Sequence, residues 1–502
     1  MSDSSSPRLP PGPRGVPLFG STLEAWRDPI GLMTRALSEY GDVVRLKFGP
    51  LRYVVLNHPD AIRHVLVDNP ANYTKSRNYE GLKLVLGQGL VTSEGDLWRR
   101  QRKLTQPAFH RDRLAGFAEQ MVSLTDGMCS RWAARCPAEI DVHAEMTRLT
   151  FGIVGRTLFG VDVDRHSAEV AEAVGVVSLF ARKYVERLIT IPTWVPTLAN
   201  VRFRRAMRKL DSLVQRIIDA RRLAGDKGDD LLGMLLGAES MTDDLLRDEV
   251  ITTILAGHET TANALTWMWH LLASHPGTMQ GMRDEIGDVL GEREPQPSDL
   301  SRLELVTRVV QESLRLYPPA WSFERQATGD DTVMGFAIPA GTLVGICPYI
   351  LHRTSAWWDD PERFDPDRFL PERIASRPRY AYLPFGGGPR TCIGASFAMM
   401  EAQIIASRVV RLFTFEPTRR RVDLELGVTL RPKKGLRMRV SLQKRPEPQA
   451  FTRPVAGAPG DGPHGGGRHF FLHPCREPSS GSDSPMKARH PGALESSRSR
   501  RT

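Results

Sequence analysis

Phe385-Gly-Gly-Gly-Pro-Arg-Thr-Cys392-Ile-Gly394 is the stretch of sequence from which the fold can be read. Three glycines and a proline force an irregular turn, and an apolar pattern typical of a helix follows Gly394. A cysteine where a helix begins meets unpaired backbone N–H groups and the positive end of the helix dipole, so we expect a lowered thiol pKa. The glycines allow a large flat group to approach closely, and Arg390 offers a cation to an anion. A lone cysteine is usually a buried structural residue, but such a constrained setting argues against that role for Cys392.

The pattern Phe385-x-x-Gly388-x-Arg390-x-Cys392-x-Gly394 resembles the haem-binding loop of the cytochrome P450 family at every fixed position. In that family the cysteine thiolate is the axial ligand of the haem iron, and its electron donation favours cleavage of the O–O bond. The resemblance therefore implies that Cys392 ligates the iron of haem b. It also implies that Phe385, Arg390 and Gly394 help to bind the cofactor.

Ala256-Gly-His-Glu-Thr-Thr261 is the second motif, and it lies in the middle of the longest helical pattern of the chain. A glycine inside a helix costs about 1 kcal/mol, so a polar cluster built around one needs a reason. The resemblance implies a groove for dioxygen at Ala256 and Gly257. It also implies that Glu259 and Thr260 deliver protons to bound oxygen.

This motif has two other interpretations. An exposed polar face is disfavoured by the apolar residues on both sides of the motif. His258-Glu259 also resembles the start of a metalloprotease helix, but a zinc site of that type needs a second histidine where this chain has Ala262. We therefore exclude zinc, and His258 is left without a predicted role.

Glu312-Ser-Leu-Arg315 places opposite charges three residues apart on one helical face. Alone, such a pair is typical of a surface and contributes a few tenths of a kcal/mol, roughly 0.2–0.5. The resemblance implies instead a buried structural triad, completed by Arg368 of Phe364-Asp-Pro-Asp-Arg368-Phe369. Arg363 is an alternative candidate for the third position.

Trp98 and Arg102 lie one helical turn apart, so an indole N–H and a guanidinium can reach the same anion. The resemblance implies that both bind a haem propionate and that Arg325 binds one as well. The basic run that contains Arg102, residues 99–103, could instead form a solvated basic face, which is the less favoured interpretation.

Beyond the motifs, the sequence predicts a mainly α fold with small β-sheets. The periodicity is helical from about residue 95 to 315. One helix of about 33 residues, or roughly 50 Å, starts near Thr242-Asp-Asp and stops at His275-Pro276-Gly277. Residues 43–48 and 52–56 read as a β-hairpin, and short strands mix with loops over 332–350. The resemblance implies the cytochrome P450 fold in a single large haem-binding domain.

The chain has 502 residues and a formal net charge of +10, which raises the question of a polyanionic partner. Half of that charge falls in segment 443–502, where 24 of 60 residues are Pro, Gly or Ser. We predict that this segment is a disordered basic tail, that residues 1–9 are disordered, and that 10–442 form the haem-thiolate domain. The basic residues of the tail are too diffuse for nucleic-acid binding, and no binding motif accompanies them.

Five cysteines, few and widely spread, indicate a reducing compartment. The polar N-terminus carries no signal sequence, and the chain has no run of about 18 apolar residues that could span a membrane. We expect a cytoplasmic monomer without a transmembrane anchor.

The predicted activity is that of a haem-thiolate monooxygenase, which inserts one oxygen atom from O2 into a small molecule. Electrons would come from a separate ferredoxin-type donor with an NAD(P)H reductase. We expect the donor to dock on a basic face made of Arg99, Arg100, Arg102 and Lys103.

Two alternatives are a peroxide-driven peroxygenase or isomerase, and a haem-based sensor or carrier without enzymatic activity. The intact Glu259-Thr260 pair disfavours the first, because such enzymes typically lack it. The absence of a nucleic-acid-binding motif disfavours the second.

The expected substrate is lipophilic, such as a terpenoid or a fatty-acyl chain, because the segments that line the pocket in this family are apolar here. Each of these residues could equally belong to the core. The predicted pocket residues are Val91, Phe180, Leu255, Ala320 and Phe323.

Overall fold

The computed structural model describes residues 7–163, 167–186, 191–225, 228–419 and 421–443. The predicted terminal segments lie almost wholly outside these ranges, and the domain boundaries remain a prediction. Gln443 still belongs to the body that precedes it, because its N–H donates to the Leu412 carbonyl at 2.8 Å.

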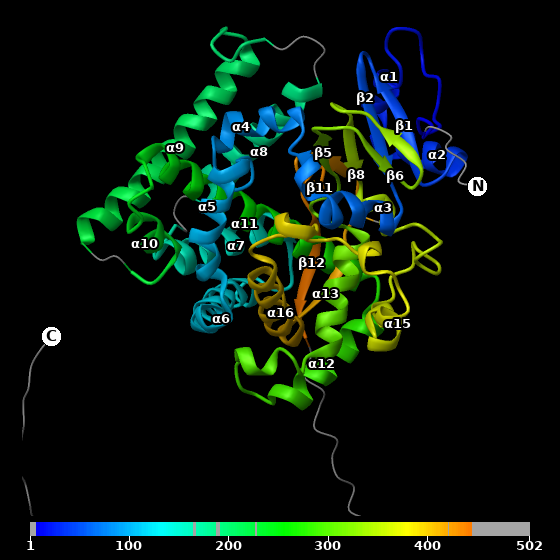
Figure 1. Ribbon diagram of the computed structural model, residues 1–502. Helices are drawn as coiled ribbons and strands as arrows, with labels where there is room; N and C mark the ends of the chain where they lie inside the picture. The colour runs from blue at the N-terminus through cyan, green and yellow to red at the C-terminus, as the bar shows by residue number, and fades with distance from the viewer. Residues whose placement is uncertain (1–6, 164–166, 187–190, 226–227, 420, 444–502) are drawn as a thin grey trace, which may run out of the picture. The chain divides into compact units, whose positions relative to one another are not determined.

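The longest helix of the described chain is α11 (Asp243–Ala273), which runs among the other helices in Figure 1. The Thr242 side chain accepts the Leu245 N–H at 3.3 Å, and Asp243 and Asp244 in the first turn complement the helix dipole. The sequence predicted this start correctly. The helix ends at Ala273, a little before the predicted stop at His275-Pro276.

Helix α11 packs mainly against α7 (Val142–Phe159), and also against α13 (Glu304–Leu316) and α9 (Leu198–Ala224). Helix α16 (Ala395–Leu412), which follows the glycine-rich loop, packs against α6 (Arg111–Ala133). One apolar core joins these helices. No helix of the described residues is both long enough and apolar enough to cross a membrane.

The described chain has further α-helices, several of which contribute buried side chains to the same core. They are α1 (Thr22–Arg27), α2 (Pro29–Tyr40), α3 (Pro59–Arg63), α4 (Glu80–Leu86), α5 (Gly95–Thr105), α8 (Ser167–Glu186), α10 (Leu231–Leu236), α12 (Pro276–Leu290), α14 (Pro348–Leu351) and α15 (Pro371–Ala375).

The largest sheet has five strands in the order β1-β2-β8-β5-β3. Strands β1 (Val43–Phe48) and β2 (Leu51–Leu56) form the predicted hairpin, and Gly49 supplies the positive φ of its turn. Strand β8 (Leu343–Ile346) runs parallel to β2, and β5 (Phe323–Ala327) pairs with β8 in the opposite direction. Strand β3 (Tyr73–Thr74) closes the edge.

The other sheets are small. Strand β12 (Arg437–Leu442) lies between β4 (Ala138–Asp141) and β9 (Phe413–Pro417). Strands β6 (Asp331–Val333) and β7 (Phe336–Ile338) form one hairpin, and β10 (Leu424–Leu426) and β11 (Leu430–Pro432) form another. The predicted strand region 332–350 thus ends earlier than expected, because Pro348 begins the short helix α14.

Candidate functional site

The loop before Cys392 depends on glycines with positive φ. Gly386 and Gly388 have φ values of +70° and +67°. A Cβ on Gly388 would lie 1.9 Å from the Leu66 carbonyl oxygen, so the loop can approach that backbone only with glycine. The Cys392 N–H donates to the Phe385 carbonyl at 2.9 Å, which closes the loop before α16 begins at Ala395.

Cys392 is solvent-exposed. Protein atoms nevertheless surround its thiol closely enough for desolvation to raise the thiol pKa. The Gly394 N–H and the charge of Arg102 act in the opposite direction, but they do not overcome desolvation. The prediction of a lowered thiol pKa from the helix terminus alone was therefore wrong. Cys392 could hold a metal cation, which would deprotonate the thiol.

Ala256 is exposed although it lies in α11 between buried stretches of that helix. The lack of a side chain at Gly257 is explained by helix packing, since a Cβ there would lie 3.1 Å from Val154 of α7. This glycine thus allows close packing of α7 against α11. Its part in a dioxygen groove remains a prediction.

Glu259 and Thr260 follow each other on α11, but their side chains bind different partners. The Thr260 hydroxyl donates to the Ala256 carbonyl of its own helix at 2.7 Å. The Glu259 carboxylate accepts the Thr429 hydroxyl at 2.7 Å and the Ser178 hydroxyl at 3.4 Å. Glu259 is therefore held by residues outside α11.

His258, which the sequence left without a role, is buried and packs edge-on against Phe151 of α7. Its Nδ1 donates to the Ile254 carbonyl at 2.6 Å, and burial lowers its pKa. Because Thr150 of α7 donates to the His258 carbonyl at 3.0 Å, this residue joins the two helices.

Glu312 and Arg315 lie together with Arg368, as the resemblance implies. Both Glu312 and Arg315 have 0% of their side-chain surface exposed and form two hydrogen bonds, at 2.6 and 2.8 Å. Arg368 Nε lies 3.4 Å from Glu312 Oε1. Arg363, the alternative candidate, is 61% exposed and pairs with Asp365, so it contributes only its carbonyl oxygen to Arg315.

The predicted propionate ligands Trp98, Arg390 and Arg102 also lie in one region. The Arg390 guanidinium stacks on the Trp98 ring at 4.0 Å and pairs with Glu94. Arg102 donates to the Thr391 carbonyl at 3.0 Å, next to Cys392.

Arg325 and Lys75 add two further cations to this region. Arg325 is only 7% exposed. Burial, together with the charges of Arg325 and Arg390, lowers the pKa of Lys75 well below its ordinary value. Sequence reasoning missed Lys75, because a single lysine after a short strand has no local signal.

This cluster of cations fits a group that carries carboxylates. Glu94 is the carboxylate that pairs with Arg390 among the described residues. The nearby Glu324 carboxyl is occupied by hydroxyl and amide donors from Tyr53, Ser76 and Asn78. Lys75, Arg325 and Arg390 thus form a largely buried, under-neutralised site, and the two propionates of haem would supply the missing negative charge.

The predicted pocket residues divide into two groups. Val91, Leu255 and Phe323 are half-buried and pack against the apolar cores, and Ala320 is exposed, so a contact of these residues with substrate remains a prediction. Phe180 of α8 is buried, and its ring stacks on Phe203 of α9 at 4.1 Å. Phe180 therefore packs between helices, and a contact with substrate remains a prediction.

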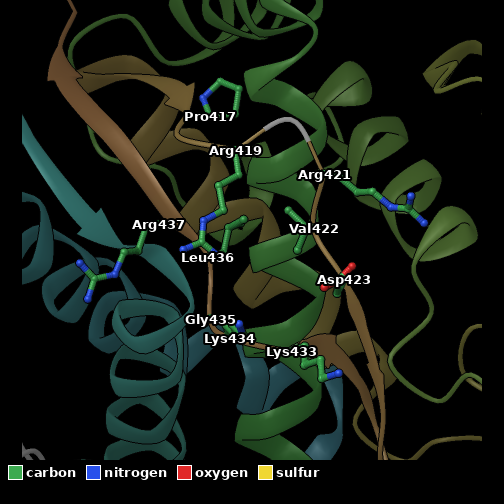
Figure 2. A pocket seen from close by; sticks show the side chains of 10 residues that line it. All are labelled: Pro417, Arg419, Arg421, Val422, Asp423, Lys433, Lys434, Gly435, Leu436 and Arg437. Atoms are coloured by element: carbon green, nitrogen blue, oxygen red, sulfur yellow. The ribbon is translucent and has the colours of Figure 1, made fainter.

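The cavity shown in Figure 2 is not part of this site. It has a volume of about 80 Å³ and lies beside the ends of β9 and β12. Exposed cationic side chains line it, and Figure 2 shows that Arg421 and Arg437 point in different directions. None of the predicted site residues reaches it.

Comparisons with known proteins agree with this geometry. The family model of cytochrome P450 matches residues 10–438. The chain is 38% identical over 447 residues to cyclooctatin synthase of Streptomyces melanosporofaciens, across 87% of this chain and 95% of the relative. It is 34% identical to cyclooctat-9-en-7-ol 5-monooxygenase of the same organism, across 81% of this chain and 89% of the relative. It is also 34% identical to pentalenene oxygenase of Streptomyces avermitilis, across 86% of this chain and 96% of the relative.

Proposed function

Because this chain belongs to the cytochrome P450 family and is a haem-dependent oxygenase, we propose that it inserts one oxygen atom from O2 into a terpenoid. The observation that carries the choice of substrate is the set of relatives that match over most of their length and are named for cyclooctatin, cyclooctat-9-en-7-ol and pentalenene. The half-buried apolar side chains of Val91, Leu255 and Phe323 support a lipophilic ligand.

The residues of the site have distinct proposed roles. Cys392 ligates the haem iron through its thiolate, and Arg102, Arg325, Arg390 and Trp98 bind the propionates. Lys75 joins this set, since its amine lies among the same cations. The haem supplies the activation of dioxygen, and the protein orients the substrate and controls access of protons.

Glu259 and Thr260 are proposed to manage those protons. The Thr260 hydroxyl donates to the Ala256 carbonyl, so its lone pairs can accept a hydrogen bond from another group. Glu259 is the nearest carboxylate in sequence, and its side chain is only 13% exposed. A carboxylate that is mostly buried but still partly exposed can exchange protons with solvent and pass them to the site.

We propose that electrons come from a separate ferredoxin-type donor. Arg99, Arg100 and Lys103 are exposed on α5, so they offer positive charge to an acidic partner. Arg102 is half-buried beside Thr391, so its contribution to such a face is smaller. Association with the donor should weaken as ionic strength rises.

Two measurements test the proposed function. The ferrous–CO spectrum of the wild type should show the red-shifted Soret band of a thiolate ligand, and Cys392→Ala should lose it. Turnover with a surrogate ferredoxin, its reductase and NAD(P)H should oxidise members of a panel of diterpenes and sesquiterpenes in preference to fatty acids. Turnover that occurs with hydrogen peroxide but not with O2 and the electron donor, or no turnover on any panel, would contradict the proposal.

A further inference from the structure

The Glu259 carboxylate is fixed by two elements that approach α11 from outside. Thr429, in the turn between β10 and β11, donates its hydroxyl hydrogen to Glu259 Oε1 at 2.7 Å. Ser178 of α8 donates to Oε2 at the longer distance of 3.4 Å. The Thr429 contact is therefore the shorter of the two and the one we expect to determine where the carboxylate lies.

Thr429 is itself oriented by a buried chain of side chains. Asn263, fully buried on α11, donates its Nδ2 hydrogen to the Thr429 hydroxyl oxygen at 3.2 Å. The Asn263 carbonyl oxygen lies 3.0 Å from His143 Nε2 on α7. Because an amide oxygen only accepts hydrogen bonds, His143 Nε2 is the donor to Asn263. Burial lowers the pKa of His143.

The Thr429 hydroxyl has only one hydrogen to donate. Because Asn263 occupies an acceptor position of Thr429, that one hydrogen is left for Glu259. The chain His143, Asn263, Thr429 thus points every donor toward the carboxylate.

The charged groups around Glu259 do not replace this contact. Arg431 Nη1 lies 4.0 Å from Glu259 Oε1, and its Nε donates to Glu425 at 2.7 Å, so its charge is shared. His258 and His143 are the other titratable groups that face the carboxylate, and burial lowers the pKa of both. Thr429 therefore provides the closest directional contact that Glu259 makes in the described chain.

We propose that Thr429, oriented by Asn263 and His143, is a positioning residue that holds Glu259 for proton delivery. This inference rests on the proposed function, in which Glu259 handles protons. Thr429 itself transfers no proton and touches no substrate in this role. Its loss should leave the carboxylate free to move, so that fewer of the consumed electrons end in oxidised product.

The test compares Thr429→Val, which keeps the shape and removes the hydroxyl, with Thr429→Ser, which restores it. Thr266→Val is the matched control, since Thr266 is buried on α11, the helix that carries Glu259, and its hydroxyl donates to the Ala262 carbonyl at 2.6 Å. Each holoenzyme is assayed for product, for hydrogen peroxide released per NAD(P)H, and for substrate affinity by spectral titration. Glu259→Gln and the double variant Glu259→Gln/Thr429→Val complete a double-mutant cycle.

We expect Thr429→Val to lower kcat for product about tenfold, since general acid catalysis is worth about 10²–10⁴ and only one anchor is removed. Hydrogen peroxide per NAD(P)H should rise, substrate affinity should stay the same, and Thr429→Ser should recover most of the activity. In the Glu259→Gln background Thr429→Val should have little further effect. Crystal structures give a readout that is independent of turnover: the Glu259 carboxylate should move in Thr429→Val and stay in place in Thr429→Ser.

The inference is wrong if Thr429→Val behaves like Thr266→Val, if the two substitutions of the cycle have additive effects, or if Glu259 keeps its position in Thr429→Val. Failure of the proposed function looks different, because the wild type itself would then lack the thiolate ferrous–CO band or form no product. The crystallographic comparison still decides the positioning role in that case.

Discussion

Glu312 shows how much depends on one buried carboxylate. Its oxygens accept two hydrogen bonds from Arg315 and the Asp365 N–H at 2.9 Å, and Arg368 lies 3.4 Å away. Arg315 also donates to three backbone carbonyls of the segment between α14 and η7 (Pro366–Phe369). The ion pair is therefore the centre of a network that orders an otherwise irregular stretch of chain.

Replacing Glu312 with Gln should lower the free energy of unfolding by about 3–5 kcal/mol, because it leaves buried guanidinium charge without its partner. Urea denaturation followed by circular dichroism measures this. Glu362→Gln serves as the control, since Glu362 pairs with Arg353 at the surface and is 71% exposed. Equal effects of the two substitutions would show that the buried pair has no special role.

His352 should make the stability of the folded protein depend on pH. Its Nε2 accepts the Leu383 N–H at 2.8 Å, and burial with the nearby charges of Arg315, Arg353 and Arg377 lowers its pKa to about 3. In the unfolded chain a histidine titrates near 6.5, so between about pH 6.5 and 3 the unfolded state binds more protons than the folded state. Stability should therefore fall as the pH drops below 6.5.

His352 alone contributes a slope of at most about 1.4 kcal/mol per pH unit to the plot of unfolding free energy against pH. Urea midpoints measured from pH 7 to pH 5 should show a smaller decline in His352→Gln. The glutamine amide does not titrate, but it can keep the bond from the Leu383 N–H and the one that His352 Nδ1 makes to the Arg315 carbonyl at 3.2 Å. The same decline in both proteins would mean that other groups account for the acid sensitivity.

At the scale of elements, the loop before α16 depends on glycine in two different ways. Gly386 and Gly388 have nearly the same positive φ. Nothing lies within 4 Å of a Cβ on Gly386, whereas a Cβ on Gly388 would collide with the Leu66 backbone. Within the chain, substitution at Gly386 therefore tests conformational strain without a collision, and substitution at Gly388 tests strain and close approach together.

We expect Gly386→Ala to lower stability by about 1–2 kcal/mol and to keep haem. Gly388→Ala should displace the loop from Leu66 and with it Cys392, so the purified protein should carry much less haem. The ratio of Soret to 280 nm absorbance measures haem content in both variants. Equal haem content would contradict the role of the Leu66 contact.

The loop also shows which parts of the site could be predicted from sequence. Local patterns identified Cys392, the long helix and the β1–β2 hairpin, since glycines, caps and periodicity act over a few residues. The thiol pKa was predicted in the wrong direction, because desolvation depends on chain segments distant from the loop. Lys75 and Thr429 were missed for the same reason, since the tertiary fold alone brings them to the site.

At the scale of the whole molecule, the described chain is closed by its last strand. Strand β12 pairs with β4, about 300 residues earlier, and with β9. Met438 and Val440 on this strand are completely buried. The sheet therefore ties the start of α7 to the end of α16, and with them two helices that flank the candidate site.

Truncation after Gln443 should leave the melting temperature, the haem content and the ferrous–CO spectrum unchanged, because β12 and the Gln443 to Leu412 hydrogen bond remain. Truncation after Leu436 removes β12, exposes the core that Met438 and Val440 cover, and leaves the edges of β4 and β9 unpaired. That protein should fail to fold or should lose haem. Differential scanning calorimetry of both truncations against the full chain makes the comparison. A lower melting temperature for the chain that ends at Gln443 would mean that residues 444–502 stabilise the haem domain, contrary to their predicted disorder.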